Sequence, residues 1–283
     1  MNQEEEHRLS HNFINNINDG ILHIYHDFGF FSNCSILLYM IIRYHNIKKM
    51  PPLRIDNSGS FTWYRPKGKE KEDVFHSFFK EFKQQDIIVN DSVQFHHFWQ
   101  YSVYKNIPNI DDIIPYIKKY FSPTDEILDL VDIITEKYKI DYDNTCVLFY
   151  RGNDKSRETP SGNYNDFFIR ANNLNNENND IRFLIQSDET EFIHLCKAQL
   201  SRNIVFENEI RHIKRNIYTS VDVQGYDNYK YAKYFLAIMI IMSKCKHVIC
   251  NSGNISLWLY FFRYIRNKNN MHNFQQCLKD QWY

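Results

Sequence analysis

The segment that decides the fold is Thr145-Cys146-Val147-Leu148-Phe149-Tyr150, followed at once by Arg151-Gly152-Asn153-Asp154-Lys155. An unbroken apolar run of this kind, without alternation, is typical of a strand buried on both faces of a parallel sheet. The polar run after it contains a glycine and predicts a turn that leads out of the sheet. Ligands of open α/β sheets bind beyond the carboxyl ends of strands, so this junction is the first candidate site.

Two more apolar runs follow the first one, at 181–186 and 247–250. These apolar runs are separated by segments with the residue spacing of helices, at 167–174, 189–200 and 228–244. Strands that alternate with helices indicate an α/β fold with a parallel sheet, which begins here near Asp143.

The first half of the chain predicts a similar but less regular pattern. Residues 20–26 read as a strand, 27–33 as a turn, 34–45 as a helix and 53–56 as a second strand. Further helices are predicted at 73–84, at 110–120, and from an N-cap at Ser122, with Pro123 in the first position, to about 138. We therefore expect an N-terminal α/β domain at 1–142. A Rossmann-like domain would follow at 143–264, and a tail at 265–283 whose last part, 271–283, is a candidate helix packing back on the first domain.

Composition and charge narrow the class of protein. The chain has 283 residues, of which 43% are hydrophobic and 16% aromatic, so a packed core is expected rather than disorder. Lys and Arg number 34, as do Asp and Glu, and this zero net charge disfavours nucleic acid as a partner.

Targeting signals are not evident in the sequence. The first residues are acidic, and the longest apolar runs, 35–42 and 234–242, are well short of the ~20 residues of a membrane-spanning helix. The six cysteines include no Cys-x-x-Cys spacing. We expect a cytoplasmic protein without a transmembrane segment.

Polar clusters follow all three strands of the second half. They lie at 151–158, at 187–189 and at 251–256, where a helix is expected to begin. Together they bring cations, carboxylates and the free amide groups of a helix N-terminus to one edge of the sheet. This combination suits a diphosphate group.

The same residues resemble a known family. Phe149-Tyr150-Arg151-Gly152-Asn153-Asp154-Lys155, with Glu158 after it, is similar to the first motif of α1,6-fucosyltransferases and nodulation fucosyltransferases, and more so to bacterial and viral relatives with Arg-Gly-Thr-Asp-Lys. Residues 183–189 and 245–252 resemble the second and third motifs. The turn Gly29-Phe30-Phe31-Ser32-Asn33 resembles the entry to the family's first domain.

The resemblance implies a GT-B fold of two facing Rossmann-like domains, with 1–142 on the acceptor side and 143–264 binding the nucleotide sugar. It also implies an inverting transfer that needs no metal or other cofactor. The partners would be a nucleotide-sugar donor and a glycan acceptor. Arg151 would bind the diphosphate and stabilise the leaving group, Lys155 would lie beside it, and Glu158 would be the candidate base. Asp188 and Ser252 would line the donor pocket. The other implied donor-binding residues are Asp154, Ser187, Asn251, Gly253 and Asn254, and the implied first-domain residues facing the cleft are Gly29, Phe30, Ser32 and Asn33.

Three positions depart from the family pattern. Asn153 replaces the usual Thr, Phe149 stands where the fucosyltransferases have a His, and Ile238 stands where they have a guanine-reading Asp. The last two changes open the choice of donor, so that UDP-xylose is as plausible as GDP-fucose. A non-catalytic glycan- or nucleotide-binding module on a degenerate GT-B fold is the alternative function.

Each candidate also has a purely structural interpretation. Arg151 and Asp154 can be an ion pair that closes a turn, while Asp188 and Glu189 can be the N-cap and first residue of a helix. Glu158 can be a solvated carboxylate, and residues 252–254 can be only a helix cap.

Other motifs are weaker. Asp141-Tyr142-Asp143 precedes a strand instead of following one, which favours a loop over a metal site. The His23/His26 and His96/His97 pairs lack a third ligand, and the aromatic run 95–101 fits core packing better than sugar stacking.

Overall fold

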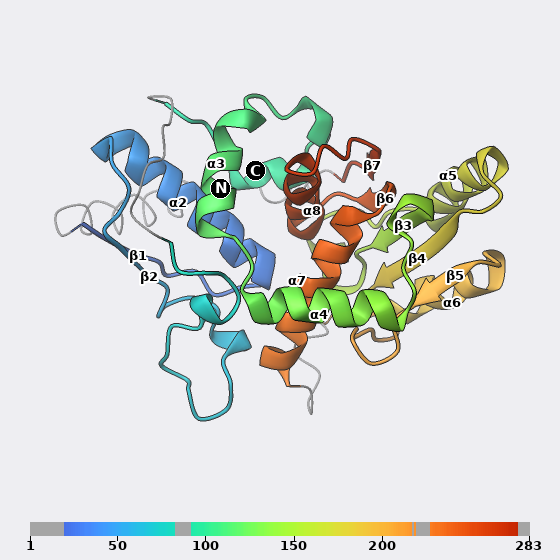
Figure 1. Ribbon diagram of the computed structural model, residues 1–283, viewed down its shortest axis with the longest axis horizontal. Coiled ribbons are helices and arrows are strands. Elements are labelled where there is room, and N and C mark those ends of the chain that lie inside the picture. The colour runs from blue at the N-terminus through green and yellow to red at the C-terminus, as the bar shows by residue number, and fades with distance from the viewer. Residues whose placement is uncertain (1–19, 83–91, 217, 219–226, 277–283) are drawn as a thin grey trace. The chain divides into compact units, whose positions relative to one another are not determined.

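The computed structural model describes residues 20–82, 92–216, 218 and 227–276 (Figure 1). The chain divides into two compact units. The described residues of unit 1 lie within Met1–Trp99 and Ile107–Asp125, and those of unit 2 within Gln100–Asn106 and Glu126–Lys279.

Unit 1 is built on one βαβ element. Strands β1 (Ile21–His23) and β2 (Arg54–Asp56) pair in parallel, and helix α2 (Phe30–Lys48) connects them. Helix α3 (Ile110–Tyr120) has the bounds that its apolar spacing predicts. The predicted turn at 27–33 is shorter than expected, because α2 begins at Phe30 with Gly29 as its N-cap.

The helix predicted at 73–84 is wrong in its described part, 73–82. Only a 3-10 turn, η2 (Phe75–Ser77), forms there, and the chain then bonds to a neighbouring segment: Lys80 N donates to Ser122 O at 2.8 Å, and Thr124 N donates to Phe78 O at 3.1 Å. Three phenylalanines at helical spacing in this segment, Phe75, Phe78 and Phe79, instead join a cluster of edge-to-face and tilted rings. Its other members are Phe30, Phe61 and Phe121.

The helix that precedes the main sheet begins later than predicted. Helix α4 runs from Asp125 to Lys137. Ser122 does not cap it, because its hydroxyl donates to the Lys118 carbonyl at 2.5 Å. Nearly all of α4 belongs to unit 2, whereas we predicted a domain boundary at 142/143.

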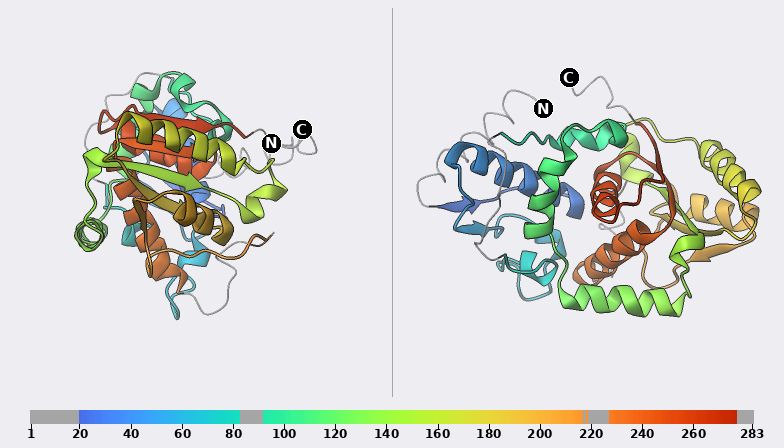
Figure 2. Two further views of the ribbon diagram at one scale, coloured as in Figure 1. Left: turned by 90° about the vertical axis from the view of Figure 1, so that its right-hand side faces the viewer. Right: turned by 45° about the horizontal axis from the view of Figure 1, so that its top comes forward.

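Unit 2 holds a five-stranded, fully parallel sheet in the order β5-β4-β3-β6-β7 (Figure 2). The chain proceeds outward from β3 on one side and then crosses to the other side, so the order reverses between β3 and β6. This is the topological switch point, where open α/β sheets bind ligands. The strands are β3 (Thr145–Tyr150), β4 (Arg182–Ser187), β5 (Asn203–Val205), β6 (His247–Asn251) and β7 (Met271–Phe274).

Four helices connect and follow these strands: α5 (Tyr164–Glu177), α6 (Thr190–Gln199), α7 (Asn228–Lys244) and α8 (Asn254–Tyr264). All six residues of β3 are buried, as its apolar run predicts. The helix predicted at 271–283 is wrong in its described part, because 271–274 form strand β7 beside β6 in unit 2.

In the described part of the chain, no helix has the length and apolar character needed to cross a membrane. Five of the cysteines, Cys34, Cys146, Cys196, Cys245 and Cys250, are buried free thiols, which fits their interpretation as small core residues.

Candidate functional site

The ends of β3 and β6 are tied together at the switch point. Arg151 directly follows β3, and its backbone N–H donates to Asn251 Oδ1 at 2.9 Å. The Asn251 side chain returns a bond from Nδ2 to the Arg151 carbonyl at 2.8 Å. Since Asn251 is the last residue of β6 and is fully buried, the backbone of Arg151 is held in place by the sheet itself.

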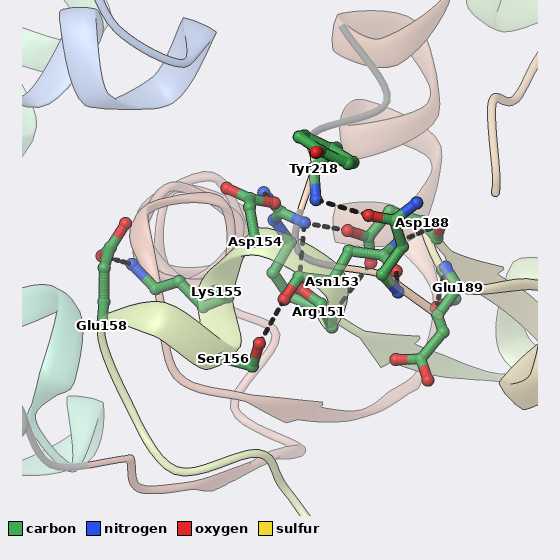
Figure 3. A network of polar contacts seen from close by, with 12 residues as sticks. Arg151, Asn153, Asp154, Lys155, Ser156, Glu158, Asp188, Glu189 and Tyr218 are labelled. Atoms are coloured by element: carbon green, nitrogen blue, oxygen red, sulfur yellow. Dashed lines mark hydrogen bonds and ion pairs between the residues drawn. The ribbon is translucent and has the colours of Figure 1, made fainter. Parts of the chain in front are cut away.

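Two carboxylates orient the Arg151 guanidinium (Figure 3). Nη1 donates to Asp188 and to the Gly152 carbonyl, while Nη2 donates to Asp154 Oδ1 at 2.5 Å. A guanidinium carries five N–H donors. The Nε–H and one N–H of Nη2 therefore have no partner among the residues that the structure describes, and the Arg151 side chain is 22% exposed. Adjacent Nε and Nη2 donors can hold two oxygens of one phosphate.

Gly152 lets the turn pack against a buried acid. A Cβ at this position would clash with Glu189 Oε2. The Gly152 N–H donates to Asp188 Oδ1 at 2.9 Å, so Asp188 binds both the backbone and the guanidinium of this turn. Asp188 is thus not the N-cap of α6; that position belongs to Glu189.

Asn153 has a structural reason to replace Thr. Its φ is 48°, in the left-handed region that Asn tolerates far better than a β-branched residue does. Its side chain is buried and joins two further segments: Nδ2 donates to the Asp188 carbonyl at 2.6 Å, and Oδ1 accepts from Asn216 N at 3.0 Å. Asn216 in turn accepts from Tyr218 N at its side-chain Oδ1, which brings Tyr218 to the same region (Figure 3).

Lys155 and Glu158 form an ion pair at 2.6 Å within the 3-10 turn η6 (Asn153–Arg157) and its cap. Lys155 is only 9% exposed. Its Nζ also donates to Tyr101 Oη at 3.0 Å and to Gln100 Oε1 at 3.5 Å. These three acceptors match the three N–H bonds of an ammonium group, so Lys155 has none to spare for a phosphate in this arrangement.

The electrostatics of this pair are coupled. Burial lowers the pKa of Lys155, although the Glu158 carboxylate acts in the opposite direction. Burial by itself would raise the pKa of Glu158, but the Lys155 ammonium and the hydrogen bonds from Lys155 and Tyr101 hold it below its usual range. The Glu158 carboxylate is therefore ionised at neutral pH.

Two of the N–H groups before α8, which we expected to help bind a phosphate, already have partners in the protein. The Ser252 N–H donates to the Phe274 carbonyl at 2.9 Å, and the Gly253 N–H donates to Tyr104 Oη at 2.9 Å. The Ser252 hydroxyl accepts from Gln276 N at 2.6 Å. Both residues are buried, while Asn254 is the half-buried first residue of α8. The interpretation of 252–254 as a helix start fits this geometry better, and a phosphate role for them stays a prediction.

The second strand end is also mostly structural. Ser187 is fully buried, and its Oγ accepts from the Glu189 N–H at 3.0 Å. Glu189 is 1% exposed, accepts from Tyr164 Oη at 2.5 Å and pairs with Arg215. Sequence reasoning had no signal for Arg215 or Tyr164, because they come from other parts of the chain.

In unit 1 the predicted cleft residues divide into two kinds. Phe30 and Asn33 are buried, at 3% and 0% exposure, so their side chains serve the packing of unit 1, and their role beside a cleft stays a prediction. Asn33 exchanges two hydrogen bonds with the backbone of Phe28. Ser32 is half-buried and bonds to His26 Nε2 at 3.0 Å, and Gly29 is exposed.

The weaker motifs behave as their structural interpretations predict. Asp141 accepts from Asp143 N at 3.1 Å and Asn144 Nδ2 at 2.8 Å, which stabilises the turn before β3. The described residues contain no cluster of three or more His, Cys, Asp or Glu side chains suited to a metal ion. Metal independence of a reaction stays a prediction.

Comparisons with known proteins place this fold. No protein-family model and no curated protein sequence matches the chain. Among solved structures, the chain is similar to NodZ α-1,6-fucosyltransferase soaked with GDP-fucose, with a TM-score of 0.52 and 10% identity over 86% of this chain and 92% of that one. Fucosyltransferase NodZ from Bradyrhizobium gives a TM-score of 0.49 and 11% identity over 92% and 98% of the two chains. The predicted fold class, α/β with mostly parallel sheets, is confirmed.

Proposed function

We propose that this protein is a glycosyltransferase that takes a sugar from a nucleoside-diphosphate donor. The observation that carries the proposal is Arg151: a guanidinium at the topological switch point, fixed by Asp154 and Asp188, with two donors left unpartnered in the described structure. The α/β likeness to a fucosyltransferase described with GDP-fucose supports it.

In the proposed reaction, the Arg151 guanidinium stabilises the leaving group. When the glycosidic bond to the diphosphate breaks, negative charge grows on the departing phosphate oxygen. A cation that is already oriented stabilises this transition state more than the ground state and so raises turnover. Its two carboxylate partners hold the guanidinium still, so little reorganisation is needed when the leaving group develops its charge.

Glu158 is the proposed base for the acceptor hydroxyl in an inverting transfer. Its carboxylate is ionised at neutral pH and its side chain is 44% exposed, so it can be reached by a hydroxyl group. Lys155 has all three N–H bonds committed within the unit and serves this base more directly than it serves the donor. The acceptor is proposed to be a glycan.

The nucleobase of the donor is to be identified by binding measurements. Phe149 and Ile238, which suggested that guanine is not read, are both core residues with 3% and 0% exposure. Their side chains therefore pack in the core and do not discriminate between guanine and uracil. GDP-fucose is the first donor to test, and UDP-xylose is the alternative.

The test combines binding with turnover. A ligand specific for the folded protein raises its apparent stability by about 2.7 kcal/mol at a hundredfold excess over Kd. We expect a rise in melting temperature with GDP-fucose or UDP-xylose, together with slow hydrolysis of the stabilising donor. Binding without release of the sugar would favour the non-catalytic module, and no shift with any nucleotide sugar would refute the proposal.

A further inference from the structure

One tyrosine hydroxyl connects the two charged groups beside Arg151. Tyr101 Oη accepts from Lys155 Nζ at 3.0 Å and donates to Glu158 Oε2 at 2.9 Å. The same Glu158 oxygen accepts from Lys155 at 2.6 Å, so the three groups close a ring of hydrogen bonds. Tyr101 is remote in sequence and ends the aromatic run 95–101, for which the sequence favoured core packing.

The segment that carries Tyr101 is fixed on both sides within unit 2. Tyr104 Oη donates to the Gln100 carbonyl at 2.9 Å and accepts from the Gly253 N–H at 2.9 Å. Asn273 Nδ2 donates to the Ser102 carbonyl at 3.0 Å. Tyr101 is itself 8% exposed. Its hydroxyl is thus delivered to Glu158 by a rigid backbone, which a chance surface contact would not require.

The hydroxyl can act only as a proton donor toward Glu158. Burial and the neighbouring Glu158 carboxylate both raise the pKa of Tyr101, so it keeps its proton at any working pH. Its lone pairs accept from Lys155, and its proton stabilises the Glu158 anion. The charged and titratable groups facing Glu158 in unit 2 are Lys155, Tyr101 and Arg151.

We propose that Tyr101 is a positioning residue for the base: its hydroxyl holds the Glu158 carboxylate in place and in its ionised form, and keeps it bridged to Lys155. This inference rests on the proposed glycosyl transfer. It adds a residue from outside all three strand-end clusters to the working site. Tyr101 needs no contact with the donor or acceptor for this role.

The experiment is the pH profile of kcat/KM for donor turnover in Tyr101→Phe. Loss of the donated bond should destabilise the carboxylate, so the acidic limb should move to higher pH, by about one unit. Turnover at neutral pH should change much less than at the acidic limb. An acidic limb identical to that of the unmodified protein would overturn the inference.

Unit 2 offers a matched control of the same chemistry. Glu209 accepts from Lys137 Nζ at 2.6 Å and from Tyr138 Oη at 2.7 Å, but lies outside the candidate site residues. Tyr138→Phe removes the same kind of bond and should lower the melting temperature without moving the acidic limb. An equal shift in both variants would indicate a general effect of stability and would also overturn the inference.

Two further measurements separate this inference from the proposed function. If Tyr101→Phe does not fold, 3-fluorotyrosine at position 101 keeps the shape with a more acidic hydroxyl, and the limb should move to lower pH; no movement would refute the role. If the unmodified protein turns over no nucleotide sugar, the proposed function fails. The hydrogen bond from Tyr101 to Glu158 is then tested by stability alone. In Tyr101→Phe, the melting temperature should increase less between about pH 3 and pH 6 than it does in the unmodified protein.

Discussion

Arg151 and Asn251 exchange two hydrogen bonds across the switch point, from Arg151 N to Asn251 Oδ1 at 2.9 Å and from Asn251 Nδ2 to Arg151 O at 2.8 Å. They lie 100 positions apart in the chain. Arg151 directly follows β3, and Asn251 is the last residue of β6. The backbone beneath the proposed catalytic arginine is therefore set by tertiary structure, and the following variants test what it supports.

Asn251→Ala should lower stability and nucleotide affinity together. It leaves the N–H and carbonyl of Arg151 without partners, at a cost of roughly 2 kcal/mol or more in the free energy of unfolding. Urea unfolding and nucleotide titration measure the two effects. The control is Asn46, whose side chain makes the same reciprocal pair with Val93 in unit 1. Asn46→Ala should lose stability alone, and equal affinity in both variants would contradict the role given to Asn251.

Arg151→Lys should keep the fold and some nucleotide binding but lose turnover by about a hundredfold or more, because a lysine cannot hold two phosphate oxygens at once. Melting temperature, Kd and turnover are the measurements. Arg157→Lys, an exposed change in the same turn, should lower none of them appreciably. Normal turnover in Arg151→Lys would reduce Arg151 to a turn ion pair.

Glu158→Gln should lose stability in a pH-dependent way. The pKa of Glu158 is held below its usual range in the folded protein, so the carboxylate contributes stability above its unfolded pKa of about 4.3. That contribution disappears as the pH falls through the folded pKa. The melting temperatures of the variant and the unmodified protein should therefore differ at pH 7 and converge toward pH 3. A constant difference would show that the ion pair with Lys155 has little weight.

Turnover should persist in EDTA. The proposed leaving-group charge is met by the Arg151 guanidinium, and the described residues contain no cluster suited to a metal ion. Rates measured with EDTA, and again after adding Mn²⁺ or Mg²⁺, check this directly. Strict dependence on either ion would refute the mechanism that relies on a cationic side chain.

Much of unit 2 could be predicted because local pattern and tertiary role agree there. The apolar run 145–150 and the helix 228–244 have their predicted bounds, since both elements are buried along most of their length. The helix at 73–84 failed for the opposite reason. Phenylalanines at helical spacing fit an aromatic cluster equally well, and backbone bonds to 122–124 decided the outcome.

The candidate site could be predicted only in outline. Arg151 and Asp188 meet because parallel strands end at one edge, which the sequence order reveals. Asn216 reaches the site from a segment with no motif of its own, and Tyr101 comes from the aromatic run 95–101, for which the sequence favoured core packing. The sequence also does not reveal which N–H groups before a helix already have partners. The Gly253 N–H donates to Tyr104 Oη, nearly 150 positions away.

The bonds around Arg151 have a consequence for how the protein is made. Two of its partners, Asp188 and Asn251, lie 37 and 100 positions further along the chain. During synthesis the arginine therefore leaves the ribosome long before it can be oriented, and it acquires its final geometry only when β6 joins β3. Contacts of such long separation form slowly. Nucleotide capture in a refolding experiment would accordingly report the completion of the parallel sheet and not its first stages.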